Sequence, residues 1–117
     1  MYPVKRIKGA KLHISQNSDK MVEYLTFPGL EQLDCIKHLF STRLGGASEG
    51  IYSSMNLSFT RGDEEEKVFA NFDRIGAVLG VEREQFVLSH QTHTDHIRIV
   101  TKEDAGAGFD DCYFAQD

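Results

Sequence analysis

The sequence predicts an α+β fold in which a mixed β-sheet packs against one main helix. Residues 64–79 carry apolar side chains at helical spacing, residues 4–27 alternate as two strands around a polar turn, and residues 86–100 contain two β-branched runs. The chain has 117 residues, of which 40% are hydrophobic, and this length and composition are typical of one globular domain.

The N-terminal part is predicted to form a β-hairpin. Residues 4–14 and 21–27 are the two strands, and the turn formers at 15–19 connect them. A helical turn at 30–33 and a strand at 36–42 are expected next. A glycine- and serine-rich loop over residues 43–56 then leads to the helix.

The main helix is predicted over residues 64–79. Its apolar stripe consists of Val68, Phe72, Ile75 and Leu79. Asp63 is expected to cap its N-terminus, with Glu66 closing a capping box, and Gly80 is expected to end it. The acidic run at the helix start is therefore interpreted as helix-terminus chemistry rather than as a ligand cluster.

Composition narrows the classes of function. A net charge of −5 argues against nucleic-acid binding driven by phosphate neutralisation. No apolar run reaches membrane-spanning length, and the first residues do not resemble an export signal. Cys35 and Cys112 lie far apart in no Cys-x-x-Cys pattern, so we expect reduced thiols and a cytoplasmic protein.

The most informative segment holds His90, His93 and His96 at three-residue spacing. Imidazole is the commonest protein metal ligand. The flanks at 86–88 and 97–100 are strand-like, and side chains alternate along a strand, so the three histidines are not expected to share one face. One histidine that binds a metal together with ligands from distant segments fits this pattern better. The alternative is a polar turn whose histidine is structural.

Two further segments are candidates for binding. Arg43 with Gly45 and Gly46 places a five-donor cation beside backbone amides, which suits phosphate or carboxylate. The alternative is a simple glycine turn with Arg43 paired to a nearby acid. Asn56 is predicted to orient a substrate, or else to form an Asx-turn that ends the loop. Gln91, two residues before His93, is a further predicted substrate contact.

The ordered set of these segments resembles the YfiH-like laccase-domain family, once called multicopper polyphenol oxidases. The matching pieces are Thr42-Arg43 with Gly45-Gly46, Ser54-Met55-Asn56-Leu57, Gly62-Asp63, Asn71 with Arg74, and Gln91-Thr92-His93. Thr94-Asp95 replaces the family's usual Gly-Thr after the histidine, so the loop there departs from the family pattern.

The resemblance implies an α/β/β/α layered fold in proteins about twice this length. It also implies one metal, zinc rather than copper, bound by two histidines and one cysteine. His93 matches the first of these ligands, and the two motifs that supply the others are absent from this sequence. Residues 1–117 are therefore expected to be the N-terminal portion of a single laccase-like domain, ending before the second half of the metal site.

The activity that the resemblance implies is phosphorolysis of adenosine, inosine or methylthioadenosine, together with adenosine deamination. His93 and Arg43 are the expected catalytic residues, and a purine nucleoside and phosphate are the expected partners. A cytoplasmic amidase that edits peptidoglycan precursors and a non-catalytic binding half-domain remain alternatives, and a polyphenol oxidase is less favoured. The chain alone is expected to be inactive and to self-associate through an exposed sheet edge.

Overall fold

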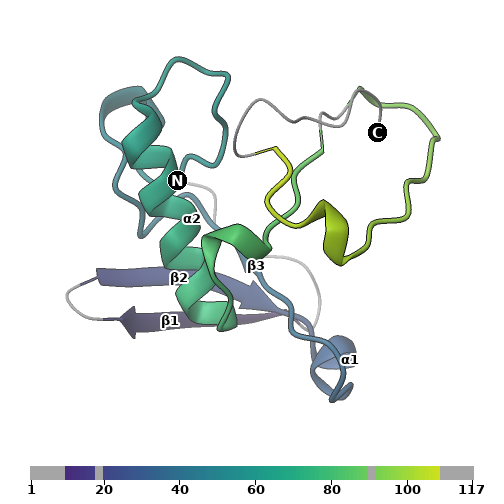
Figure 1. Ribbon diagram of the computed structural model, residues 1–117. Coiled ribbons are helices and arrows are strands. Elements are labelled where there is room, and N and C mark those ends of the chain that lie inside the picture. The colour runs from purple at the N-terminus through teal and green to yellow at the C-terminus, as the bar shows by residue number, and fades with distance from the viewer. Residues whose placement is uncertain (1–9, 18–19, 90–91, 109–117) are drawn as a thin grey trace. The chain divides into compact units, whose positions relative to one another are not determined.

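The computed structural model describes residues 10–17, 20–89 and 92–108 (Figure 1). The chain forms two compact units, Met1–Gly80 and Val81–Asp117, and each is considered by itself. The α+β class is confirmed, since the first unit combines a three-stranded sheet with one long helix. Both strand pairings are antiparallel within the described residues, where the sequence suggested a mixed sheet.

The predicted hairpin is present as β1 (Lys11–Asn17) and β2 (Lys20–Thr26). Its register pairs Lys11 with Thr26 and Asn17 with Lys20. Residues 4–9, where the first strand was expected to begin, lie outside the described residues. In the sheet order β1-β2-β3, β2 is the central strand.

The segment after the hairpin departs from its predicted boundaries. Helix α1 (Pro28–Glu31) begins two residues before the expected turn, because proline suits the first helical position, where no N–H is needed. Strand β3 is only Phe40–Ser41 instead of residues 36–42. The ladder ends early because the Phe27 amide donates to His38 Nε2 at 2.8 Å instead of to a strand carbonyl.

The main helix is confirmed as α2 (Glu65–Leu79). Val68, Phe72 and Ile75 of the predicted stripe are buried, and Leu79 is half-buried. Gly80 ends the helix with a φ of 77°, a left-handed conformation that favours glycine. The capping box is wrong: the N-cap is Glu64, whose side chain makes no cap hydrogen bond.

The core of the first unit lies between α2 and the sheet. Its buried apolar side chains are Val22, Met55, Val68, Phe72 and Ile75. Leu25 is also buried, but it lies three positions after Val22 on β2 and so belongs to the other face of the sheet. Phe59 extends this core, because its ring stacks on Phe72 with centroids 5.7 Å apart and is tilted against Phe69 at 4.9 Å. The helix and the loop before it are thus held on the sheet by apolar burial.

The described residues of the second unit include two short 3-10 turns, Arg83–Gln85 and Lys102–Asp104, and extended segments. The predicted strands at 86–88 and 97–100 are wrong, since neither belongs to a sheet in the part of the chain that is described. Two backbone hydrogen bonds, Leu88 N–H to Ala107 O and Gly106 N–H to Phe86 O, join segments 86–88 and 106–107. A strand needs a partner, and Ile97 and Ile99 remain 87% and 86% exposed.

No described helix has both the length and the hydrophobicity required to cross a membrane.

Substitution of Gly46 tests how closely the two arms of the loop pack against each other. A Cβ on Gly46 would lie 2.0 Å from the Ser54 carbonyl oxygen and 2.5 Å from Met55 Cα. We expect Gly46→Ala to lower the free energy of unfolding by at least about 2 kcal/mol in urea titration. Gly29→Ala is the matched control, because nothing lies within 4 Å of its added Cβ. An equal loss in both variants would contradict this account.

Candidate functional site

The two ends of the loop that carries Arg43 and Asn56 are joined by hydrogen bonds, and we call this junction the loop neck. The Arg43 carbonyl accepts hydrogen bonds from Ser54 N–H at 2.7 Å and Met55 N–H at 2.9 Å. The preceding residue, Thr42, connects the loop to the sheet, because its N–H donates a hydrogen bond to the Glu23 carbonyl of β2 at 3.3 Å. The fold therefore brings Arg43 and Asn56, thirteen positions apart in the sequence, to the two arms of one loop neck.

Both glycines after Arg43 have a packing role. Gly45 has a φ of 92°, and a Cβ there would lie 2.3 Å from the Met21 carbonyl oxygen of β2. Only glycine at position 45 lets the loop pass this close to the strand, and Gly46 is equally enclosed by Ser54 and Met55 of the loop's other arm. This agrees with the turn interpretation of the pair.

Neighbouring backbone amides are already engaged within the fold. Gly46 N–H donates to Ser54 Oγ at 3.0 Å, Ala47 N–H to Asn71 Oδ1 at 2.6 Å, and Leu44 N–H to Thr42 Oγ1 at 3.2 Å. The predicted cradle of exposed amides beside Arg43 is therefore largely absent from the described loop. An anion bound there would depend chiefly on the guanidinium.

The Arg43 side chain is exposed, and among the described residues its guanidinium makes no ion pair or side-chain hydrogen bond. The alternative in which Arg43 pairs with a nearby acid is therefore not seen in this part of the chain. A planar cation with five donors stands at the loop neck and is available to an anionic group.

Asn56 forms the predicted Asx-turn, in which its Oδ1 accepts from Ser58 N–H at 3.1 Å. Its amide nitrogen donates to Asp63 Oδ2 at 3.1 Å. Substrate orientation by Asn56 stays a prediction, since these contacts already use both ends of its carboxamide.

A fully buried asparagine holds the loop on the helix. Asn71 is 0% exposed, and its Oδ1 accepts from Ala47 N–H. Its Nδ2 donates to Ser48 Oγ at 2.9 Å and to the Asn56 carbonyl at 2.8 Å. One carboxamide thus satisfies three polar groups from both arms of the loop.

Arg74, one helical turn after Asn71, fixes the same loop by a second contact. Its Nη1 donates to the Gly45 carbonyl at 2.9 Å. Its Nε is buried and has no hydrogen-bond partner among the described residues. Arg74 is therefore a positioning residue for the Gly45 segment.

Asp63 links the loop to the start of α2. Its carboxylate accepts hydrogen bonds from Ser48 Oγ, from Asn56 Nδ2 and from Glu64 N–H at 2.8 Å. These bonds, the one from the Ser48 hydroxyl above all, lower the pKa of Asp63 from its ordinary value. The same contacts draw Asp63 away from the predicted N-cap geometry.

His93 belongs to the second unit and has a left-handed backbone with a φ of 61°. Histidine is one of the few residues enriched at such angles, and these conformations cluster at functional sites. The side chain is exposed. Gln91 and His90 lie outside the described residues.

Metal-ligating side chains do not gather into a complete site in the described part of the chain, where no group of three His, Cys, Asp or Glu could hold an ion. His13 and His38 have structural contacts instead. His13 stacks on Tyr24 with ring centroids 5.1 Å apart, and His38 accepts the Phe27 N–H.

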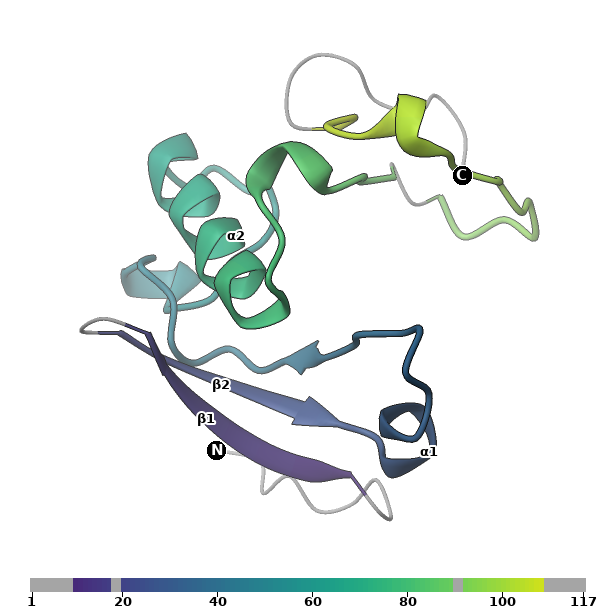
Figure 2. The same ribbon diagram turned by 60° about the horizontal axis from the view of Figure 1, so that its bottom comes forward.

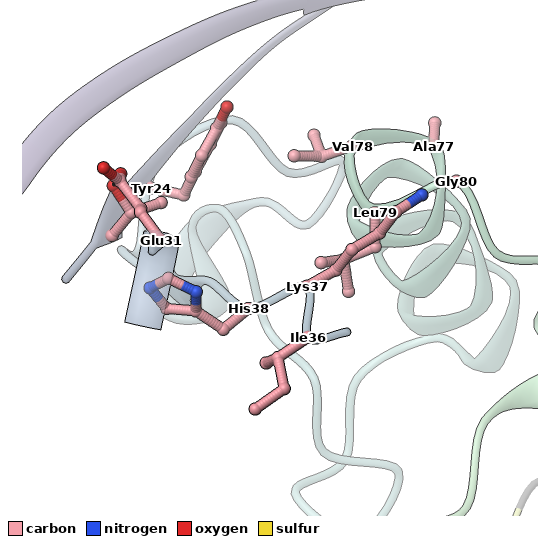
Figure 3. A pocket seen from close by; sticks show the side chains of 10 residues that line it. Tyr24, Glu31, Ile36, Lys37, His38, Ala77, Val78, Leu79 and Gly80 are labelled. Atoms are coloured by element: carbon pink, nitrogen blue, oxygen red, sulfur yellow. The ribbon is translucent and has the colours of Figure 1, made fainter. Parts of the chain in front are cut away.

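A cavity of about 400 Å³ lies beside the C-terminal end of α2, and Arg43, Gly45, Gly46 and Asn56 are not among its lining residues (Figure 3). Its lining comprises Tyr24, Thr26, Glu31, Ile36, Lys37, His38 and residues 77–80. Thr26 Oγ1 donates to Glu31 Oε1, and this bond, with help from Lys11, lowers the pKa of the Glu31 carboxyl.

Sequence reasoning missed the part played by Ser48, and placed Asn71 and Arg74 only within a motif. A signal for Asn71 was present, because it lies three residues after Val68 and four before Ile75, on the buried side of the helix. A polar residue at such a position indicates a buried hydrogen-bonded side chain. No comparable sequence pattern points to Ser48.

Comparison with known protein families agrees with this fold and with these sequence motifs. Residues 37–117 match the family described as multi-copper polyphenol oxidoreductase laccase. The chain therefore belongs to this laccase-domain family, as the resemblance implied.

Relatives of this chain carry a purine nucleoside phosphorylase name. One from Bacteroides thetaiotaomicron is 34% identical over 87 residues, covering 74% of this chain and 32% of that protein. YlmD of Geobacillus stearothermophilus is 35% identical over 71 residues, covering 61% of this chain and 26% of that protein. The family is thus one of enzymes named for purine nucleoside chemistry.

Two solved structures share the fold. YlmD from Geobacillus stearothermophilus has a TM-score of 0.67 and 28% identity, covering 84% of this chain and 35% of that chain. YfiH from Bacillus licheniformis has a TM-score of 0.57 and 24% identity, covering 77% and 28%. The matched segments therefore cover about a quarter to a third of the relatives' length. The 87 matched residues that make up 32% of the Bacteroides protein give that protein about 270 residues, in agreement with the expectation of proteins about twice the length of this chain.

Removing the Asn71 carboxamide should detach the loop from the helix. We expect Asn71→Ala to lower the free energy of unfolding by about 2–4 kcal/mol, because it leaves buried partners without hydrogen bonds. Urea unfolding followed by circular dichroism measures this. Glu65→Ala, at an exposed position of the same helix, should change stability by less than about 0.5 kcal/mol. A loss for Asn71→Ala as small as that of the control would show that the network contributes little.

Acid stability should depend on Asp63. Because folding lowers its pKa, Asp63 stabilises the fold above the unfolded-chain value of about 4, and this contribution disappears as the pH falls through the folded value. We expect Asp63→Asn to be less stable than wild type at pH 7, with the difference shrinking toward pH 2. Thermal unfolding across this range tests the sign. Asp73→Asn, on the exposed side of α2, serves as the comparison. A difference that stays constant with pH would rule out the assigned carboxylate interactions.

Proposed function

We propose that this chain is the N-terminal portion of a single-domain, zinc-dependent purine nucleoside enzyme. The proposed reactions are phosphorolysis of adenosine, inosine or methylthioadenosine and deamination of adenosine. One observation carries the proposal: the family match spans residues 37–117, and so includes Arg43, Asn56 and His93, in a family whose relatives are named purine nucleoside phosphorylases.

Arg43 is proposed to bind the phosphate co-substrate. In phosphorolysis a phosphate oxygen forms a bond to the ribose anomeric carbon while the bond to the purine nitrogen breaks. A dianion of this kind needs a cation with several donors, and the exposed Arg43 guanidinium provides it. Because the nearby amides are engaged, loss of this one side chain should remove most of the anion binding from the loop.

The residues described do not by themselves fit a bound zinc ion. His93 supplies one imidazole, while a catalytic zinc site takes three protein ligands. We assign His93 as one ligand of a set completed by sequence beyond this chain, and Gln91 and Asn56 as contacts to the nucleoside. His93's left-handed backbone supports a functional position for its loop.

A copper-dependent polyphenol oxidase, the activity in the family's description, is less well supported. Several histidine-rich copper sites are needed for such chemistry, and five histidines occur in this sequence, of which His13 and His38 have structural contacts. We therefore favour the nucleoside reactions named for the relatives.

The test uses the complete product of the gene that encodes this chain. With inosine and phosphate as substrates, Arg43→Ala should lower kcat/KM about 100-fold, mainly through a higher KM for phosphate. His93→Ala should lose both turnover and the equimolar zinc measured by elemental analysis. Chromatography of the released base measures the rate.

Matched controls are available for both substitutions. Arg61→Ala and His96→Ala change exposed residues of the same types and should retain activity and zinc. Normal phosphorolysis by Arg43→Ala would refute its assigned role. Cleavage of a muropeptide precursor, with adenosine and inosine left unchanged, would replace the proposal with the amidase alternative.

A further inference from the structure

The cavity beside the C-terminal end of α2 is formed by three parts of the first unit. The last turn of α2 lies over the sheet, and residues 77–80 form one wall of the cavity (Figure 2). Tyr24 and Thr26 of β2 form another wall, and the segment after β2 contributes Glu31 and residues 36–38. Its volume of about 400 Å³ is typical of a site for a small molecule.

His38 provides this cavity with a hydrogen-bond donor whose position is fixed. Its Nε2 accepts the Phe27 N–H at 2.8 Å, and its ring stacks on the Phe27 ring with centroids 5.9 Å apart. Because an accepting nitrogen carries no proton, the proton of the neutral imidazole is on Nδ1. Within the described ranges this Nδ1–H has no acceptor. A ligand with an acceptor oxygen would satisfy it.

Lys37 provides a positive charge. Its side chain extends along the cavity toward the end of α2 (Figure 3), where a Cβ added to Gly80 would lie 3.3 Å from Lys37 Nζ. The negative end of the helix dipole favours a cation at this position. In the part of the chain that the structure describes, Lys37 forms no ion pair, so its ammonium group has no anionic partner there.

Glu31 is the acidic residue of the lining, and other residues already engage its carboxylate. Thr26 Oγ1 donates to its Oε1, and His13 Nε2 lies 3.7 Å from the same oxygen. Lys11 Nζ lies 3.6 Å from its Oε2. Lys37 is thus the charged group of the lining that lacks a partner. Glu31 still repels anions, and it repels a dianion about twice as strongly as a monoanion.

The rest of the lining is largely apolar. Ala77, Val78 and Leu79 line the cavity from the helix, and Ile36 lines it from the segment after α1. Ile36 is 42% exposed, so apolar surface remains open to solvent at this cavity. The hydrocarbon part of a ligand would cover this surface and gain the free energy of apolar burial.

We propose that this cavity binds a small monocarboxylate with a hydrocarbon body. Lys37 supplies the counter-charge, His38 Nδ1–H donates to a carboxylate oxygen, and the hydrocarbon part packs on the apolar wall. A phosphate dianion is a poorer ligand because of Glu31, so this site differs in chemistry from the one proposed at Arg43. The proposal does not rest on the nucleoside reactions.

A ligand with a positive charge is the alternative occupant. The C-terminal end of a helix and a carboxylate both attract cations. Here, however, the Lys37 ammonium already lies at the helix end, and Glu31 already has Lys11 as its ionic partner. A second cation would therefore be repelled by Lys37 and would compete with Lys11.

The experiment measures binding of 4-methylpentanoate to the complete product of the gene that encodes this chain, by ligand-observed NMR and isothermal titration calorimetry. We expect saturable binding with a dissociation constant on the order of 1 mM, as for other ligands of this size. The neutral 4-methylpentanamide should bind about tenfold more weakly, because it lacks the charge-assisted contact with Lys37. Inorganic phosphate should not displace the carboxylate.

Lys37→Gln should weaken binding of 4-methylpentanoate about tenfold and leave phosphorolysis of inosine unchanged. Lys102→Gln is the matched control, because Lys102 is an exposed lysine of the second unit, and it should change the affinity by less than about twofold. The proposal is overturned if the wild-type protein shows no saturable binding, or if 4-methylpentylamine binds more tightly than the acid. It is also overturned if Lys37→Gln and Lys102→Gln have equal effects. None of these binding measurements requires turnover, so a failure of the nucleoside proposal would leave them unaffected.

Discussion

The rest of the first unit depends on the hydrogen bonds of one buried carboxamide. Asn71 sits among apolar neighbours on α2 and holds Ala47, Ser48 and the Asn56 carbonyl. In an environment of low polarity such bonds are stronger than in water, and any one left unmade is costly. The network therefore admits one arrangement of loop and helix, and Arg74 and Asp63 fasten the same loop at two further points.

This constraint shapes the candidate site. Packing of the loop against β2 requires glycine at position 45, and packing of its two arms against each other requires glycine at position 46. The same packing uses the Gly46 and Ala47 amides, which a glycine-rich loop would otherwise present to an anion. What remains accessible is the Arg43 side chain at the loop neck. The backbone of this segment thus stabilises the fold, and only its side chains are able to bind a ligand.

The sequence supported a prediction of α2 and of the hairpin because both are local. The apolar stripe of Val68, Phe72 and Ile75 can be recognised from the sequence of the helix alone. The two hairpin strands are likewise neighbours in the sequence, separated only by their turn. The Asp63 cap failed because the carboxylate found a partner fifteen residues away, in Ser48. That contact cannot be predicted from the sequence next to Asp63. The position of Asn71 on the buried side of the helix, by contrast, is a sequence feature that indicates a buried polar network.

The segments at 86–88 and 97–100 have the composition of strands but are not strands in the described part of the chain, because a strand forms only beside a hydrogen-bonding neighbour. The same reasoning applies to the metal site, since His93 has the chemistry of a ligand, and no group of three ligating side chains that could hold an ion occurs in the described part of the chain. Strand formation at these segments and assembly of a metal site both depend on residues far away in the sequence, which local sequence patterns do not reveal.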